Sequence, residues 1–125
     1  MPTTPLALSL LVFVGGGVGA VLRFWAGEVV RPFEWKFPWA TFGINVVGSF
    51  VLGVVASAFA AEEKAWWRAL LGAGVCGGFT TFSTFSVETL KLIDEERWAA
   101  AGGYAVGSVL AAVVGAWAGG RLVRG

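Results

Sequence analysis

The sequence has few of the residues with which enzymes carry out chemistry. Its 125 residues include no histidine and one cysteine, Cys76. Histidine is the commonest proton shuttle and metal ligand. A single cysteine cannot form an internal disulfide, and a structural zinc site needs about four ligands. The sequence also offers no recognisable nucleophile–base pair or metal-binding cluster. We therefore predict that the protein is not an enzyme.

Charge is scarce as well. Charged residues make up 14% of the chain and hydrophobic residues 57%, whereas a soluble domain is about 25% charged. The net charge is +1 without a basic run, so nucleic acid is not an expected partner. The composition favours membrane lipid as the surroundings. The length predicts one domain, residues 1–125.

Four long stretches contain no charged side chain, namely residues 1–22, 37–61, 69–87 and 98–120. A helix needs about 20 apolar residues to cross the hydrocarbon core of a bilayer. Most of the seven tryptophans stand near the ends of these stretches, where amphipathic rings favour the membrane interface. We predict an all-α membrane protein with four transmembrane helices, at about residues 6–30, 38–61, 66–92 and 98–122.

The basic residues do not give these helices a clear orientation. Four lie on the side that holds both termini, and four lie on the opposite side, with Arg23 as a fifth if it extends outward. Orientation follows an excess of lysine and arginine on one side, and here there is almost none. The balance favours dual topology, with two copies paired antiparallel. The alternative is a single orientation, set by a weak charge bias that another factor recognises.

The third predicted helix contains residues that weaken helices. Gly77 and Gly78 are adjacent, and Thr80 and Thr81 follow them closely. In a membrane, backbone groups freed by a break must be satisfied by protein, water or an ion, and transport proteins use broken helices to expose them. We predict a break near the middle of this helix. The alternative is a packing notch whose threonines bond to their own helix.

Helical spacing sorts the side chains after the break into stripes. Thr81 and Thr84 share a face with Glu88, Phe82 shares one with Phe85, and Ser83 pairs with Ser86. Hydroxyl groups donate hydrogen bonds to anions, and the edge of an aromatic ring is positive. These side chains are therefore candidates for an anion path, although aromatic pairs more often pack in a core.

Other polar residues stand within or near the predicted spans. Asn45 lies well inside the second helix, where its amide needs a partner. Pore lining and an interhelical hydrogen bond explain it equally well. Tyr104 and Ser108, four residues apart on the fourth helix, form a possible polar track. Arg23 either extends to the interface or draws anions into a vestibule.

These motifs resemble those of the fluoride channel family known as Fluc or CrcB. The matching segments are residues 16–23 (GGVGAVLR), residues 41–50 (TFGINVVGSF), and residues 77–86 (GGFTTFSTFS) followed by Glu88. The third segment is specific, whereas the first two alone are weak signals. The resemblance runs from the first predicted helix to the last, and the length and the number of spans also fit.

The resemblance implies an antiparallel, dual-topology homodimer in the inner (plasma) membrane, with two pores through which fluoride leaves the cytoplasm passively. By this similarity, Asn45 donates to fluoride, and Phe82 and Phe85 offer it their ring edges. Candidate hydroxyls in the pore are those of Thr81, Ser83, Thr84, Ser86, Tyr104 and Ser108, and Arg23 matches a vestibule arginine. A structural sodium ion is implied at the dimer centre, held by backbone carbonyls at Gly77 and Thr80 of both subunits.

Two other functions compete with this interpretation. Proton-coupled small multidrug exporters share the four helices and the length, but they depend on a carboxylate deep in the first span. Residues 1–22 contain no Asp or Glu, and the nearest acid to a span is Glu88 at the end of the third helix. A scaffold without transport activity would explain the small residues of the helices, but it leaves residues 80–85 (TTFSTF) unexplained.

Overall fold

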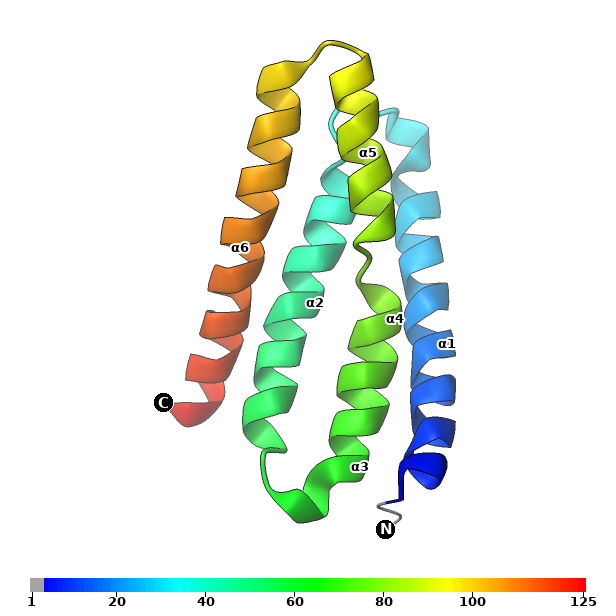
Figure 1. Ribbon diagram of the computed structural model, residues 1–125, viewed down its shortest axis with the longest axis vertical. Coiled ribbons are helices and arrows are strands. Elements are labelled where there is room, and N and C mark those ends of the chain that lie inside the picture. Colours follow the sequence, from blue (N-terminus) through cyan, green and yellow to red (C-terminus); the bar gives the residue numbers. More distant parts are fainter. Residues whose placement is uncertain (1–3) are drawn as a thin grey trace.

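A computed structural model describes residues 4–125, and their regular secondary structure is entirely helical (Figure 1). The long helices are α1 (Pro5–Val30), α2 (Trp39–Ala58) and α6 (Trp98–Arg124), and short 3₁₀ turns η1 (Arg31–Phe33) and η2 (Glu62–Lys64) follow α1 and α2. Four helical stretches are long and apolar enough to cross a membrane. The prediction of four membrane-spanning helices is confirmed.

The third stretch is divided into several segments. It consists of α3 (Ala65–Trp67), the π-helix η3 (Arg68–Cys76), α4 (Gly77–Phe79) and, after a non-helical linker, α5 (Ser83–Asp94). Thr80 adopts an extended conformation, with φ −82° and ψ 158°. Figure 1 shows the resulting gap between α4 and α5. The predicted break is therefore confirmed, whereas the wider π-helical turn had no sequence signal.

Glycines allow α1 to lie directly against the backbone of the third stretch. A Cβ on Gly15 would collide with the carbonyl oxygen of Leu70, and one on Gly19 would collide with that of Val75. From the other side, a Cβ on Gly78 would collide with the carbonyl oxygen of Gly16. Small residues permit this close approach of helices in lipid, where dispersion contacts rather than water exclusion drive packing.

Helices α2 and α6 also pack closely at glycine residues. A Cβ on Gly53 would collide with the carbonyl oxygen of Ala116, and one on Gly119 would collide with that of Phe50. Figure 1 shows α6 running beside α2, and α1 runs beside η3 and α4. The bundle therefore consists of two close helix pairs, and α5 packs against α6 at one end.

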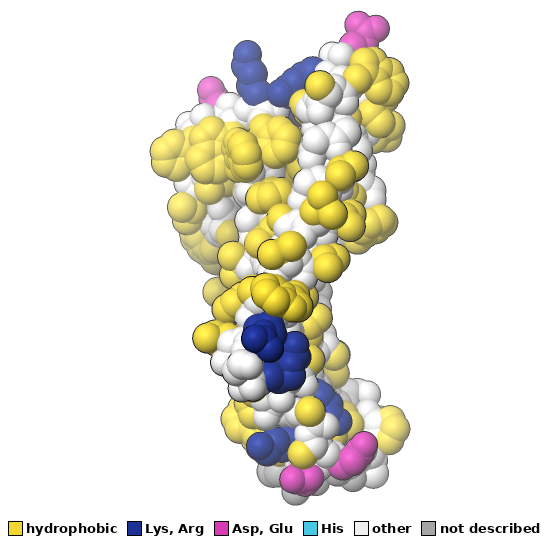
Figure 2. Space-filling model, turned by 90° about the vertical axis from the view of Figure 1, so that its left-hand side faces the viewer, with side chains coloured by type: hydrophobic (Ala, Val, Ile, Leu, Met, Phe, Trp, Pro, Cys, Tyr) yellow, Lys and Arg dark blue, Asp and Glu magenta, His cyan; other side chains and the backbone are white. Residues whose placement is uncertain are grey.

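The chain buries little of its hydrophobic surface within itself. Tyr104 is fully buried in a small cluster with Leu92 and Ala101, whereas Phe13 is 80% exposed. Between 11% and 22% of the residues in each spanning window are buried. Figure 2 shows hydrophobic side chains over much of one face, with charged ones gathered toward its two ends. The protein is a multi-pass membrane protein whose outer faces meet lipid or another chain.

Candidate functional site

Asn45 holds the break in the third stretch by two hydrogen bonds. Its Nδ2 donates to the carbonyl oxygen of Thr81 at 3.0 Å, and its Oδ1 accepts from the N–H of Thr81 at 2.9 Å. These bonds replace those that a continuous helix would supply to Thr81. Of the two roles left open by the sequence, the interhelical hydrogen bond is therefore present, on α2 at the level of the break.

The break also frees carbonyl groups at the end of α4. The N–H of Thr81 donates to Asn45 rather than to the carbonyl of Gly77 one turn earlier. The neighbouring carbonyl of Gly78 accepts a hydrogen bond from Arg23 Nε at 3.1 Å. Arg23 therefore points inward to the break and does not extend to the interface. A cation suits this position because the C-terminal end of a helix is electronegative.

A groove of about 280 Å³ runs beside the break, between α2, α5 and α6. Six of the predicted site residues, which come from all sides of the groove, line it: Asn45, Thr80, Thr81, Phe82, Phe85 and Ser108. Ser49, one turn beyond Asn45, and Ala112, one turn beyond Ser108, also contribute to its wall. The structure thus brings together side chains that lie up to 67 positions apart in the sequence, from Asn45 to Ala112.

Two aromatic rings, one just before α5 and one in its first turn, form one side of the groove. The ring centroids of Phe82 and Phe85 are 5.7 Å apart, with 41° between the ring planes. Phe85 is half-buried against Tyr104, whereas Phe82 is 78% exposed. A side chain as apolar as Phe82 at this level is stable only beside lipid or a partner chain, and it leaves the groove open along one side.

Ser108 supplies a hydroxyl group with no protein partner. It is 7% exposed, and among the described residues 4–125 its Oγ is the one buried side-chain polar atom without a hydrogen bond. An unsatisfied buried hydroxyl is unfavourable by about 1–3 kcal/mol. Because Ser108 lines the groove, a ligand or water in the groove would satisfy it.

Tyr104 is not part of the groove wall. It has no exposed surface, and its hydroxyl donates to Glu88 Oε1 at 2.9 Å. This bond fixes the middle of α5 to α6. The contact joins residues 16 positions apart on two helices, and no spacing rule in the sequence could have indicated it.

Several other hydroxyl groups of the motif form hydrogen bonds with nearby backbone groups. Thr80 Oγ1 and Ser86 Oγ donate to the carbonyls of Cys76 and Phe82, both at 2.9 Å. Thr81 Oγ1 accepts from the N–H of Thr84 at 3.2 Å and lies 3.4 Å from Ser83 Oγ, so that it satisfies one N–H group in the first turn of α5.

A second polar cavity, of about 430 Å³, lies on the other side of α5 against α1. Its walls include Arg23, Thr81, Thr84 and Glu88 together with the buried Thr41 of α2. Thr81 and Thr84 therefore border the cavity against α1, whereas Phe82 and Phe85 border the groove beside α6. Glu88 reaches both sides, because it lines this cavity while its carboxylate is bonded to Tyr104 of α6. Each face of α5 borders a cavity of different chemistry.

Comparison with known proteins identifies the family. The sequence model described as "CrcB-like protein, Camphor Resistance (CrcB)" matches residues 10–120. The chain belongs to the CrcB family. The match includes most of the first and last spanning stretches and all of the other two, with the break and the groove.

Curated relatives are similar along nearly the whole chain. A protein of Novosphingobium aromaticivorans is 48% identical over 118 residues, which cover 91% of this chain and 94% of the relative. One of Opitutus terrae is 42% identical over 119 residues, covering 91% and 90%. One of Caulobacter vibrioides is 43% identical over 114 residues, covering 88% and 90%. All three are named "Fluoride-specific ion channel FluC".

Proposed function

We propose that this CrcB-family protein is a fluoride-selective channel that lets cytoplasmic fluoride leave passively across the inner (plasma) membrane. The observation that carries this proposal is the groove, in which one amide, one unsatisfied hydroxyl and two aromatic rings line a path at the level of the break. The identity of the ion rests on the names of the relatives. Their naming as channels also speaks against the exporter and scaffold alternatives and against an enzyme.

The chemistry of the groove suits a small anion. Hydroxyl and amide groups can replace part of the water shell of fluoride, and the edges of Phe82 and Phe85 add positive charge density without a fixed cation. The first N–H groups of α5 lie at the same level, and the N-terminal end of a helix favours anions. Ionised carboxylates do not occur in the wall of the groove.

The groove needs a second chain to become a pore. In one chain, Phe82 is 78% exposed, so one side of the path would face hydrocarbon, where no fluoride ion could pass. Around Gly103 and Gly107 on α6 there is open space, which leaves room for close approach of a helix. A homodimer with two such grooves would close both paths.

Antiparallel pairing agrees with the positions of the basic residues. One end of the bundle carries Arg31, Lys36, Lys91 and Arg97, and the other carries Lys64, Arg68, Arg121 and Arg124. Arg23 belongs to neither set because it is bonded to Gly78 within the bundle. Four charges against four give insertion no preferred direction. The two orientations would then form in similar amounts and pair.

The carbonyls at the break are suitable ligands for the proposed sodium ion. Gly77 is exposed, and its carbonyl lost its helical donor when Thr81 turned to Asn45. Carbonyl oxygens bind hard cations, and among residues 4–125 no cluster of His, Cys, Asp or Glu competes for a metal. In a dimer, Gly77 and Thr80 of both chains would surround the ion. A dimer whose thermal stability is the same with and without sodium would argue against this site.

The proposal is tested by fluoride efflux from liposomes that contain the purified protein, with chloride efflux from identical liposomes as the control. We expect rapid loss of fluoride and retention of chloride. Fluoride retention by liposomes that contain folded protein would refute the function.

Orientation is tested in intact cells with an impermeant thiol reagent on Glu62→Cys or Asp94→Cys, which mark opposite ends of the bundle. Because Cys76 is buried, it does not react. Dual topology predicts that about half of each variant is labelled. Full labelling of one variant and none of the other would show a single orientation.

A further inference from the structure

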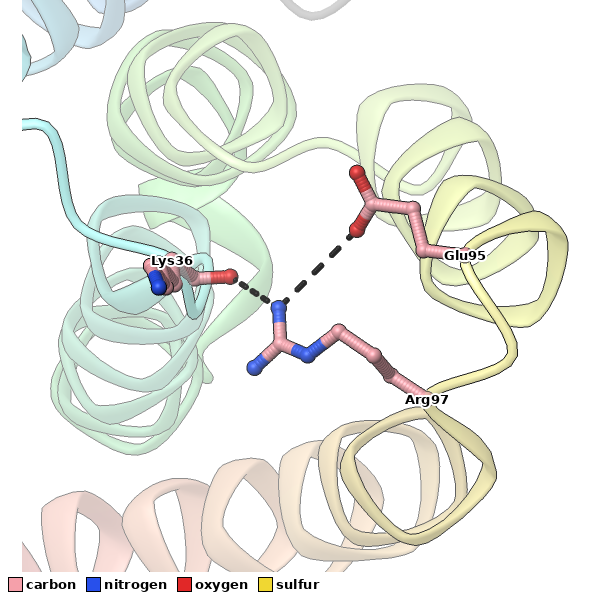
Figure 3. A network of polar contacts seen from close by, with 3 residues as sticks. All are labelled: Lys36, Glu95 and Arg97. Carbon is pink, nitrogen blue, oxygen red and sulfur yellow. Dashed lines mark hydrogen bonds and ion pairs between the residues drawn. The ribbon is translucent and has the colours of Figure 1, made fainter.

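Arg97 stands at the junction of two connections that close one end of the bundle. Its Nη1 donates to the backbone carbonyl of Lys36 at 2.6 Å and lies 3.9 Å from Glu95 Oε1. Figure 3 shows the guanidinium group reaching from the start of α6 toward that carbonyl, in the connection between α1 and α2. The side chain thus joins segments 61 positions apart in the sequence.

The backbone of Arg97 is itself fixed to the end of α5. Its N–H donates to the carbonyl of Leu92 at 2.9 Å, and the N–H of Glu96 donates to that of Ile93 at 2.8 Å. Glu96 is in the left-handed region, with φ 59°, which completes a Schellman-type end of the helix. Arg97 therefore connects α5, through its backbone, to the α1–α2 connection, through its side chain.

On the other side of this contact, a chain of aromatic rings leads to the groove. Lys36 is followed by Phe37, whose ring lies edge-on against Tyr104 with centroids 5.3 Å apart. The ring of Tyr104 is 4.9 Å from that of Phe85, which lines the groove. The carbonyl that Arg97 holds is thus next in the chain to the first ring of this series.

We propose that Arg97 is a positioning residue for the fluoride path: by holding the Lys36 carbonyl to the end of α5, it fixes Phe37 against Tyr104 and thereby fixes the ring of Phe85. This inference rests on the proposed function, because the role of Phe85 does. Arg97 does not line the groove, so it acts through the ring series and has no contact with the ion there.

A purely electrostatic role for Arg97 makes different predictions. Arg97, Lys36 and Lys91 line a cavity of about 510 Å³ at this end, together with Glu34, Glu88 and Glu95. Cations at a mouth can raise the local anion concentration, and salt screens such steering. Lys36 is the matched control, because its side chain carries one of these charges whereas the bond to Arg97 uses its backbone carbonyl.

The test compares fluoride efflux of Arg97→Ala, Arg97→Lys and Lys36→Ala at low and high ionic strength. Because the loss of a group that preorganises a site costs at least about tenfold in rate, we expect Arg97→Ala to slow efflux about tenfold at both ionic strengths. Lys36→Ala should stay within about twofold, and Arg97→Lys, which keeps a donor, should recover most of the rate. Equal losses in both alanine variants that vanish in high salt would overturn the proposal in favour of steering.

A double-mutant cycle tests the route through the rings. If Arg97 acts through Phe37, then in a Phe37→Leu background Arg97→Ala should have little further effect, because the contact that it positions is already gone. Losses that multiply independently would overturn this route. The cycle therefore separates the ring series from a general loosening of the bundle.

Hydrogen exchange gives a readout that does not depend on conduction. A charge-assisted hydrogen bond corresponds to about a tenfold change in a local opening equilibrium. In Arg97→Ala, the amides of residues 34–37 and of the last turn of α5 should therefore exchange about tenfold faster. Unchanged exchange there would show that the bond from Arg97 to the Lys36 carbonyl, here called the Arg97 clamp, does not hold the two segments together. If the wild-type protein passes no fluoride but exchange rises as expected, the proposed function fails and the clamp stands.

Discussion

Asn45→Asp is expected to abolish fluoride efflux. The substitution keeps the size and one oxygen acceptor for the Thr81 N–H, but it removes the Nδ2 donor to the Thr81 carbonyl. An ionised carboxylate in the groove would also repel fluoride by about 4 kcal/mol at 4 Å in an effective dielectric of 20. We therefore expect efflux to fall by two orders of magnitude or more, measured in liposomes with equal amounts of folded protein.

Asn45→Ser is the control that separates charge from hydrogen bonding. Serine is neutral and keeps one donor and one acceptor, but it is too short to make both bonds to Thr81. We expect an intermediate loss of efflux and a thermal midpoint in detergent close to that of Asn45→Asp. A folded Asn45→Asp protein that passes fluoride within about threefold of wild type would contradict the role of the groove.

Gly19→Ala is expected to have the largest effect on stability. Its new methyl group would collide with the carbonyl oxygen of Val75 and lie 2.8 Å from the backbone nitrogen of Phe79. Backbone atoms cannot rotate out of the way, so α1 must move away from η3 and α4. Overpacking of this kind typically costs 1–3 kcal/mol, and we expect a loss of about 3 kcal/mol or more, seen as a lower midpoint of thermal unfolding in detergent.

Gly17→Ala is the matched control on the same helix. A Cβ at Gly17 has nothing within 4 Å, and alanine favours a helix over glycine by about 1 kcal/mol. This variant should unfold at the same temperature as wild type or at a higher one. Similar losses in the Gly17 and Gly19 variants would show that α1 does not pack on the third stretch as described.

The break in the third helix was predictable because its causes are local. Gly77, Gly78, Thr80 and Thr81 weaken a helix wherever they occur together. The separation of Phe82 and Phe85 from Thr81 and Thr84 also follows from helical spacing alone. Local sequence was therefore sufficient to predict both the helix break and the two faces of α5.

The groove itself was not predictable, because its contacts join distant parts of the chain. Asn45 bonds to Thr81 across 36 positions, and Arg23 bonds to Gly78 across 55. The sequence left Asn45 undecided between two roles and Arg23 undecided between two directions. Only the packing of α1 and α2 against the break determines which groups each side chain meets.

The π-helix η3 and the clamp of Arg97 had no sequence signal at all. A π-turn depends on how a helix meets its neighbour, here the glycines of α1. Arg97 lies in a charged connection, and in the sequence it is only one of the basic residues that bear on membrane orientation. The family resemblance, in contrast, supplied the ion, which no residue pattern could have identified.

The central claim, that fluoride passes along the groove, is tested most directly by fluoride efflux with Phe82→Ile beside Phe13→Ile. Both rings are similarly exposed, at 78% and 80%, but Phe82 lines the groove whereas Phe13 lies on the outer face of α1. Isoleucine keeps the apolar bulk and removes the positive ring edge. We expect Phe82→Ile to slow fluoride efflux at least about tenfold, as a misplaced or missing group in a preorganised site does, and Phe13→Ile to match wild type. Equal efflux in both variants would place the fluoride path somewhere other than this groove.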